Sequence, residues 1–233
     1  MSAQKKILMI VTSHDLLDGQ RTTGLWLEEA ATPYRIFAEE GFSVDIASIK
    51  GGKAPVDVRS IPEKVTPDLQ PVMDALERTM ELGSISEAEY DAVYLPGGHG
   101  TMFDLPGNER LQEIIRSMYE KGKTVAAVCH GPSALVSLRL TNGTPLIKGK
   151  TVTAFTNGEE LEAEMEGSIP FYLETRLLED GAIFKKAPNW HDHIERDGNL
   201  ITGQNPQSSA SIARAVAASL AETQAKAAQA KTA

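Results

Sequence analysis

Cysteine is the scarcest residue type in this chain of 233 residues, because Cys129 is the only one. A single thiol cannot form a disulfide within the chain, which favours a reducing compartment, and we expect the cytoplasm. The sequence also lacks an apolar run close to the roughly 20 residues that a membrane-spanning helix needs. Its first residues are polar and lead directly into a predicted strand, which argues against a secretory signal.

Positively charged residues are fewer than negatively charged ones. The chain has 23 Lys and Arg against 32 Asp and Glu, a formal net charge of -9. This balance argues against a general nucleic-acid surface, so we expect neither a nucleic acid nor a membrane as partner. No repeat or linker divides the sequence, and one domain over residues 1–233 is expected. Residues 223–233, composed mainly of Ala, Lys, Gln and Thr, are predicted to form a frayed tail or to extend the last helix.

Apolar strands alternate with amphipathic helices along the chain, and several strands lack the period-two polarity of a half-exposed sheet. This pattern predicts an α/β fold, a three-layer sandwich with a mostly parallel central sheet flanked by helices. Strands are expected over 5–12, 42–47, 92–95, 125–128, 151–155, 182–186, 193–196 and 200–202. Helices are expected over 25–40 with a kink or break at Pro33, and over 74–82, 108–122, 132–138, 159–165, 170–179 and 205–221.

The only cysteine follows one of these buried strands directly. After Cys129 come His130, Gly131 and Pro132, which permit a sharp turn and the first turn of a helix. A strand, a tight turn and a helix would place the sulfur on a nucleophile elbow, near the helix N-terminus, where the dipole favours the thiolate. The alternative is an inert thiol in the core.

In a parallel sheet the active site lies beyond the carboxyl ends of the strands, so the loops there should meet. These are the loops at 13–29, 96–103 and 129–132, and the second contains three glycines whose amides could approach an oxyanion. The first loop leads into Glu28 and Glu29, either of which could serve as a base. Glu159 and Glu160 are both candidates for the carboxylate that orients His130.

The segment His191-Asp192-His193 is a candidate metal fragment, because two residues two apart on a strand face the same side. No third ligand follows at a recognisable spacing, which favours surface or loop roles for both histidines.

Two motifs together resemble a known superfamily. Residues 127–132, Ala-Val-Cys-His-Gly-Pro, and residues 95–100, Leu-Pro-Gly-Gly-His-Gly, look like the DJ/PfpI superfamily, whose fold is class I glutamine amidotransferase-like, or flavodoxin-like. The stretches 23–33, 155–160 and 197–206 further resemble its branch of heat-shock chaperones and glutathione-independent glyoxalases.

The resemblance implies a reaction in which methylglyoxal or glyoxal is converted to a hydroxy acid by water, without glutathione, metal or other cofactor. It selects Glu29 over Glu28 and Glu160 over Glu159. The residues that it implies are Cys129 as nucleophile, His130 beside it, Glu29 as general base, Glu160 as the carboxylate of the triad, Gly98 with the His130 amide as oxyanion donors, and Gly97 and His99 next to them.

Other members of the superfamily leave alternatives open. The resemblance equally permits a protein deglycase that acts on early glycation adducts, or a stress-related holdase chaperone that needs an exposed apolar patch and no thiol. It also implies a homodimer.

Overall fold

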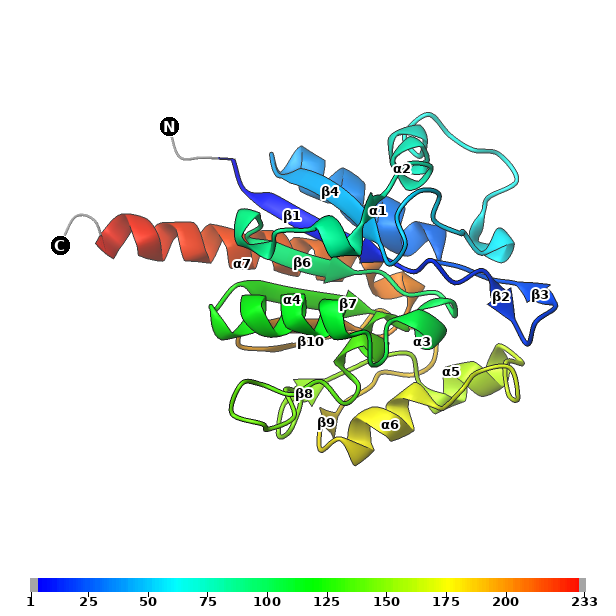
Figure 1. Ribbon diagram of the computed structural model, residues 1–233. Coiled ribbons are helices and arrows are strands. Elements are labelled where there is room, and N and C mark those ends of the chain that lie inside the picture. The colour runs from blue at the N-terminus through cyan, green and yellow to red at the C-terminus, as the bar shows by residue number, and fades with distance from the viewer. Residues whose placement is uncertain (1–3, 231–233) are drawn as a thin grey trace.

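The computed structural model describes residues 4–230 and contains a central sheet of seven strands. The strands follow the order β10-β11-β7-β6-β1-β4-β5, and only the β10–β11 pair is antiparallel. Figure 1 shows β4, β1, β6 and β7 side by side in the middle of this sheet. Their bounds are β1 Lys6–Val11, β4 Ser43–Ser48, β5 Met80–Glu81, β6 Ala92–Leu95, β7 Thr124–Val128, β10 Ile194–Asp197 and β11 Leu200–Gly203. The predicted α/β fold with a mostly parallel sheet is confirmed.

Helices cover both faces of this sheet, and each face has its own apolar core. On one face lie α1 (Leu27–Glu39), α2 (Gln70–Leu76) and α7 (Ser209–Ala230). On the other lie α4 (Glu109–Glu120) and α6 (Leu173–Glu179), with the short helices α3 (Thr101–Asp104) and α5 (Asn157–Glu162) at the carboxyl end of the sheet. The 3₁₀ turns are η1 Val58–Ser60, η2 Leu82–Ser84, η3 Glu87–Glu89, η4 Gly131–Leu135 and η5 Pro206–Ser208.

Of the kink or break predicted at Pro33, the break does not occur, because α1 continues as one helix from Leu27 to Glu39. Proline has no N–H to offer the carbonyl of Glu29, four residues earlier. That carbonyl instead accepts a hydrogen bond from the hydroxyl of Tyr94 on β6, at 2.9 Å. The proline therefore costs the helix one internal bond, and the sheet replaces it.

Other predicted elements also differ in the structure. The helix expected over 74–82 is α2, which ends at Leu76, and residues 80–81 form the strand β5. The strand expected over 151–155 is only β8, Thr151–Val152, and it pairs with β9, Ile183–Phe184, in a separate small sheet. The region expected to be a loop after β1 contains a short hairpin of β2, Leu16–Leu17, and β3, Arg21–Thr22.

Of the two alternatives predicted for residues 223–233, a frayed tail or an extended helix, the structure shows the extension. Helix α7 continues to Ala230, and residues 231–233 lie outside the described part of the chain. None of the helices within residues 4–230 has the length and apolar character needed to cross a membrane.

Candidate active site

Cys129 lies at the end of β7 in a strained backbone conformation. Its φ is 59°, in the left-handed region that residues other than glycine rarely adopt. Backbone hydrogen bonds to two neighbouring segments hold it there, because its N–H donates to the carbonyl of Gly203 on β11 and its carbonyl accepts from the amide of Phe155, both at 2.9 Å. Gly131 must be glycine, since a Cβ atom would lie 2.3 Å from the carbonyl oxygen of Leu95. The chain forms the predicted elbow at the carboxyl edge of the sheet.

The α-helix expected over 132–138, whose N-terminus would favour a thiolate, does not form. The segment after the elbow is the five-residue 3₁₀ turn η4, not an α-helix over 132–138. The thiol is 3% exposed, and burial together with the adjacent carboxyl of Glu29 raises the pKa of Cys129 well above its ordinary value. Burial and the Glu29 carboxyl thus oppose ionisation of the thiol, and a base beside Cys129 would help it to become a nucleophile.

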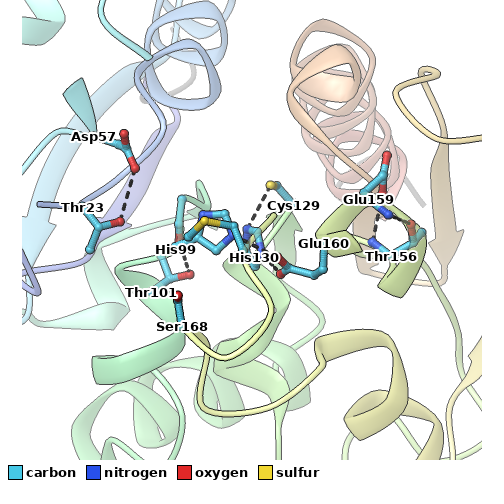
Figure 2. A network of polar contacts seen from close by, with 12 residues as sticks. Thr23, Asp57, His99, Thr101, Cys129, His130, Thr156, Glu159, Glu160 and Ser168 are labelled. Carbon is cyan, nitrogen blue, oxygen red and sulfur yellow. Dashed lines mark hydrogen bonds and ion pairs between the residues drawn. The ribbon is translucent and has the colours of Figure 1, made fainter. Parts of the chain in front are cut away.

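His130 offers one such base, as Figure 2 shows. Its Nδ1 lies 3.3 Å from the sulfur of Cys129, and its Nε2 lies 2.5 Å from Oε1 of Glu160. Burial opposes the charge on Glu160, but the His130 ring and the hydrogen bonds from His130 and His99 lower the pKa of this carboxyl to about 2. An ionised carboxylate only accepts, so the ring proton sits on Nε2 and leaves Nδ1 free to accept the thiol proton.

His99 is the second imidazole on the same carboxylate. Its Nε2 lies 3.1 Å from Oε2 of Glu160, and its ring centroid is 4.1 Å from that of His130. Burial and the neighbouring His130 lower the pKa of His99 to about 4, so this ring is neutral at physiological pH. The residue expected beside the oxyanion site thus also contacts the carboxylate that orients His130.

Glu29 lies beside the Cys129 sulfur on the side provided by α1. The carboxyl is fully buried, its Oε2 accepts from the amide of Gly97 at 2.7 Å, and its Oε1 has no hydrogen-bond partner among the described residues. Burial raises the pKa of Glu29 from 4.5 to about 8, although the nearby Cys129 thiol and the hydrogen bond from the Gly97 amide oppose the rise. Glu28 is exposed to solvent, so the structure brings Glu29 and not Glu28 to the thiol.

The carboxylate of Glu159 stabilises the start of α5 and makes no hydrogen bond to His130. It forms a capping box with Thr156 at the start of α5, and its Oε1 accepts from the side chains of Gln204 and Asn205 and from the amide of Trp190. The spacing Thr-x-x-Glu is the sequence signature of a capping box and could have separated the two glutamates without the structure. Glu160, one residue on, is the one that faces His130 (Figure 2).

The glycine loop after β6 supplies free amides. Neither the amide of Gly98 nor that of His130 donates a hydrogen bond within residues 4–230, and both residues line the same cavity as Cys129. Gly98 has a φ of 99°, and a Cβ on Gly97 would lie 2.5 Å from the His130 nitrogen, so both positions require glycine. The predicted meeting of the three loops is confirmed, since the Trp26 amide also donates to the Gly97 carbonyl at 3.1 Å.

The cavity over Cys129 has a volume of about 150 Å³ and is walled mainly by aromatic side chains. Sequence reasoning did not assign Arg59, Ala163, Trp190 or Pro206 to the site. Both tryptophans of the chain, Trp26 and Trp190, line this one cavity. The full lining is Trp26, Arg59, Gly98, His99, Cys129, His130, Phe155, Ala163, Trp190 and Pro206.

One group of described side chains could hold a metal ion. His99, His130 and Glu160 each offer a ligand atom, and these atoms lie within 4.8 Å of one another. In this arrangement the three side chains satisfy one another by hydrogen bonds, so a metal ion would have to displace the protons between them. His191 and His193 belong to no such group within the described residues.

The fold and the site together define a class of protein: an α/β protein with a cysteine on a nucleophile elbow, a histidine held by a carboxylate, and a second buried carboxyl beside the thiol. Residues 24–219 match the DJ-1/PfpI family, and the chain belongs to that family.

Relatives with solved structures or known names cover nearly the whole chain. The glutathione-independent glyoxalase HSP31 of Saccharomyces cerevisiae is 32% identical over 91% of this chain and 96% of its own length. The crystal structure of glyoxalase III from Candida albicans is 30% identical, with a TM-score of 0.81 over 92% of this chain and 97% of that one. The Rapid Encystment Protein 24 KDa of Francisella tularensis is 36% identical, with a TM-score of 0.87 over 93% and 99%.

Proposed function

We propose that this protein is a glutathione-independent glyoxalase that converts methylglyoxal and water to lactate. One observation carries the proposal: two separate bases, His130 and Glu29, lie beside the buried thiol of Cys129. A simple thiol hydrolase needs one base for the sulfur, whereas an internal redox rearrangement of an oxoaldehyde also needs a group that moves a proton between two carbons. Relatives named as glyoxalases, similar over nearly the whole chain, support the same reaction.

The first step is addition of sulfur to the aldehyde. Nδ1 of His130 takes the thiol proton while the Cys129 sulfur attacks the aldehyde carbon, C1. The amides of Gly98 and His130 stabilise the oxyanion that forms, and the imidazolium then protonates it to a hemithioacetal. Glu160 keeps His130 in the required tautomer, so it acts as a positioning residue.

The second step moves a proton from C1 to C2. The ionised carboxylate of Glu29 removes the C1 proton, and the electrons move to the C2 oxygen, which gives an enediolate that still carries the C1 hydroxyl. The proton of the C1 hydroxyl passes to the C2 oxygen, and Glu29 returns its proton to C2. These transfers leave a thioester at C1 and an alcohol at C2. A water molecule attacks the thioester, releases lactate and restores the thiol of Cys129. A pKa of about 8 suits this task, because a base is most effective when its pKa lies near the working pH.

A lactate assay with purified protein and methylglyoxal tests the proposal. We expect the same rate of lactate formation with and without added glutathione, because the thiol comes from the protein. A requirement for glutathione, or turnover of glycated protein with none of free methylglyoxal, would reject the glyoxalase in favour of another thiol activity. Suppression of client aggregation without any lactate would support a chaperone instead.

A further inference from the structure

The proposed reaction leaves one charged side chain of the cavity wall without a task. Arg59 is the single guanidinium or ammonium group among the described residues that line the cavity. Methylglyoxal is neutral and has no group that pairs with a cation. The cavity volume, about 150 Å³, is also roughly 10 times the ~15 Å³ that holds one water molecule, which leaves space beyond a small aldehyde.

A buried carboxylate holds the guanidinium in a fixed orientation. Asp57 is completely buried and accepts from Nε of Arg59 at 2.9 Å, from Nη2 at 2.7 Å and from the Arg59 amide at 3.0 Å. The hydroxyl of Thr23 donates to the same carboxylate at 3.3 Å, as drawn in Figure 2. This clamp removes most of the conformational freedom that an arginine side chain ordinarily has.

The clamp uses only one edge of the guanidinium. Nε and Nη2 face Asp57, so the edge formed by Nη1 and the second proton of Nη2 remains. Within residues 4–230, Nη1 meets only the sulfur of Met165, at 3.6 Å, and a thioether is a weak acceptor. A planar fork with two parallel N–H groups matches a carboxylate.

Arg59 lines the same cavity as Cys129, and its side chain is also exposed to solvent. Its charge helps to lower the pKa of His99, after burial and His130, so it acts within electrostatic range of the histidines. Its side chain is 44% exposed and also lines a neighbouring surface hollow of about 280 Å³ together with Arg21. An anion can therefore approach from outside.

We propose that the free edge of Arg59 binds a carboxylate of the ligand, and that the preferred substrates are 2-oxoaldehydes that carry a carboxylate. The aldehyde then faces Cys129 and the carboxylate faces Arg59. The identity of the aldehyde end rests on the proposed function, whereas recognition of the carboxylate does not. A charge-assisted hydrogen bond at this site gives a carboxylate a preference of about tenfold or more over a neutral amide.

Binding of an unreactive pair of probes tests this without turnover. The probes are 4-oxopentanoate and 4-oxopentanamide, which share a ketone and differ in charge. Calorimetry gives both affinities for the full-length protein. Fluorescence shows whether the cavity is occupied, because Trp26 and Trp190 both line it and are the only tryptophans. We expect the carboxylate to bind at least tenfold more tightly and to change the tryptophan emission.

Two variants locate the effect. Arg59→Met alone would leave the buried Asp57 without its partner, so the double variant Asp57→Asn/Arg59→Met removes the pair together. The preference should vanish in the double variant and persist in Arg35→Gln, which removes an exposed arginine paired with Glu39 on α1.

Equal affinities for the two probes in the wild-type protein, or no binding of either, would overturn the proposal, and this comparison depends on no variant. So would heat of binding without a change in emission, or a preference that survives in the double variant. None of these outcomes depends on lactate formation, so they are distinct from a failure of the glyoxalase assignment.

Discussion

The protonation of Glu29 should make the stability of the fold depend on pH in an unusual direction. Burial raises the pKa of this carboxyl from 4.5 to about 8 in the folded state. Below pH 4.5 the group is protonated in both the folded and the unfolded chain. Between pH 4.5 and 8 the unfolded chain loses the proton while the folded protein retains it. The contribution of this group to the free energy of unfolding therefore falls as pH rises through this window.

The size of the effect follows from the two pKa values. The interval from 4.5 to about 8, at 1.36 kcal/mol for each pH unit, corresponds to up to about 5 kcal/mol. Since a domain of this kind is stabilised by roughly 5–15 kcal/mol in total, such a change is easy to measure. Glu29→Gln removes the ionisable group and should remove this pH dependence.

Urea unfolding at pH 5, 6, 7, 8 and 9 measures it. The free energy of unfolding of Glu29→Gln, minus that of the wild type, should increase steadily with pH and level off above about pH 8. Glu28→Gln is the matched control, because its carboxyl is the neighbouring one and is exposed; partial burial raises the pKa of Glu28 as well, so this variant should show a change of the same sign but smaller. A difference between Glu29→Gln and the wild type that stays constant with pH would refute a buried, protonated Glu29.

Three further predictions concern the site. Glu160→Gln should lower kcat by roughly 100-fold, because His130 loses the carboxylate that fixes its tautomer. Glu159→Gln should mainly lower the melting temperature, because Glu159 caps α5. The reverse pattern would make Glu159 the residue that orients His130. At pH 9, where Glu29 is ionised, iodoacetamide should modify Cys129 faster in Glu29→Gln than in the wild type, because the Glu29 carboxylate raises the pKa of the thiol. An equal or slower rate of modification in the variant would contradict this effect of Glu29. Prolonged dialysis against EDTA should leave lactate formation unchanged, and a loss restored by a divalent metal would assign a metal to the site.

Much of the fold could be predicted because its strands are short apolar runs that only a buried parallel sheet accommodates. Thr124–Val128 is fully buried, and the turn chemistry of Gly131 and Pro132 after it leaves few alternatives to an elbow. The strand predicted over 151–155 was misplaced because period and composition do not indicate which partner a strand joins.

The electrostatics of the site could not be predicted in the same way. The pKa of a thiol depends on burial and on charges brought near it by distant segments, and Glu29 lies 100 positions from Cys129. Arg59 carried no signal at all, because a lone arginine in a Gly- and Pro-rich excursion is ordinarily a solvated side chain. The expected homodimer and the cytoplasmic location stay predictions; light scattering of the purified protein tests the dimer.

The central claim is that Cys129 forms the covalent intermediate, and one comparison tests it most directly. The rate of lactate formation from methylglyoxal, without glutathione, is measured for the wild type and for Cys129→Ala, with circular dichroism to verify that both are folded. The account predicts lactate from the wild type and a rate indistinguishable from the buffer blank for Cys129→Ala. Lactate formation by a folded Cys129→Ala variant at a rate comparable with the wild type would contradict it.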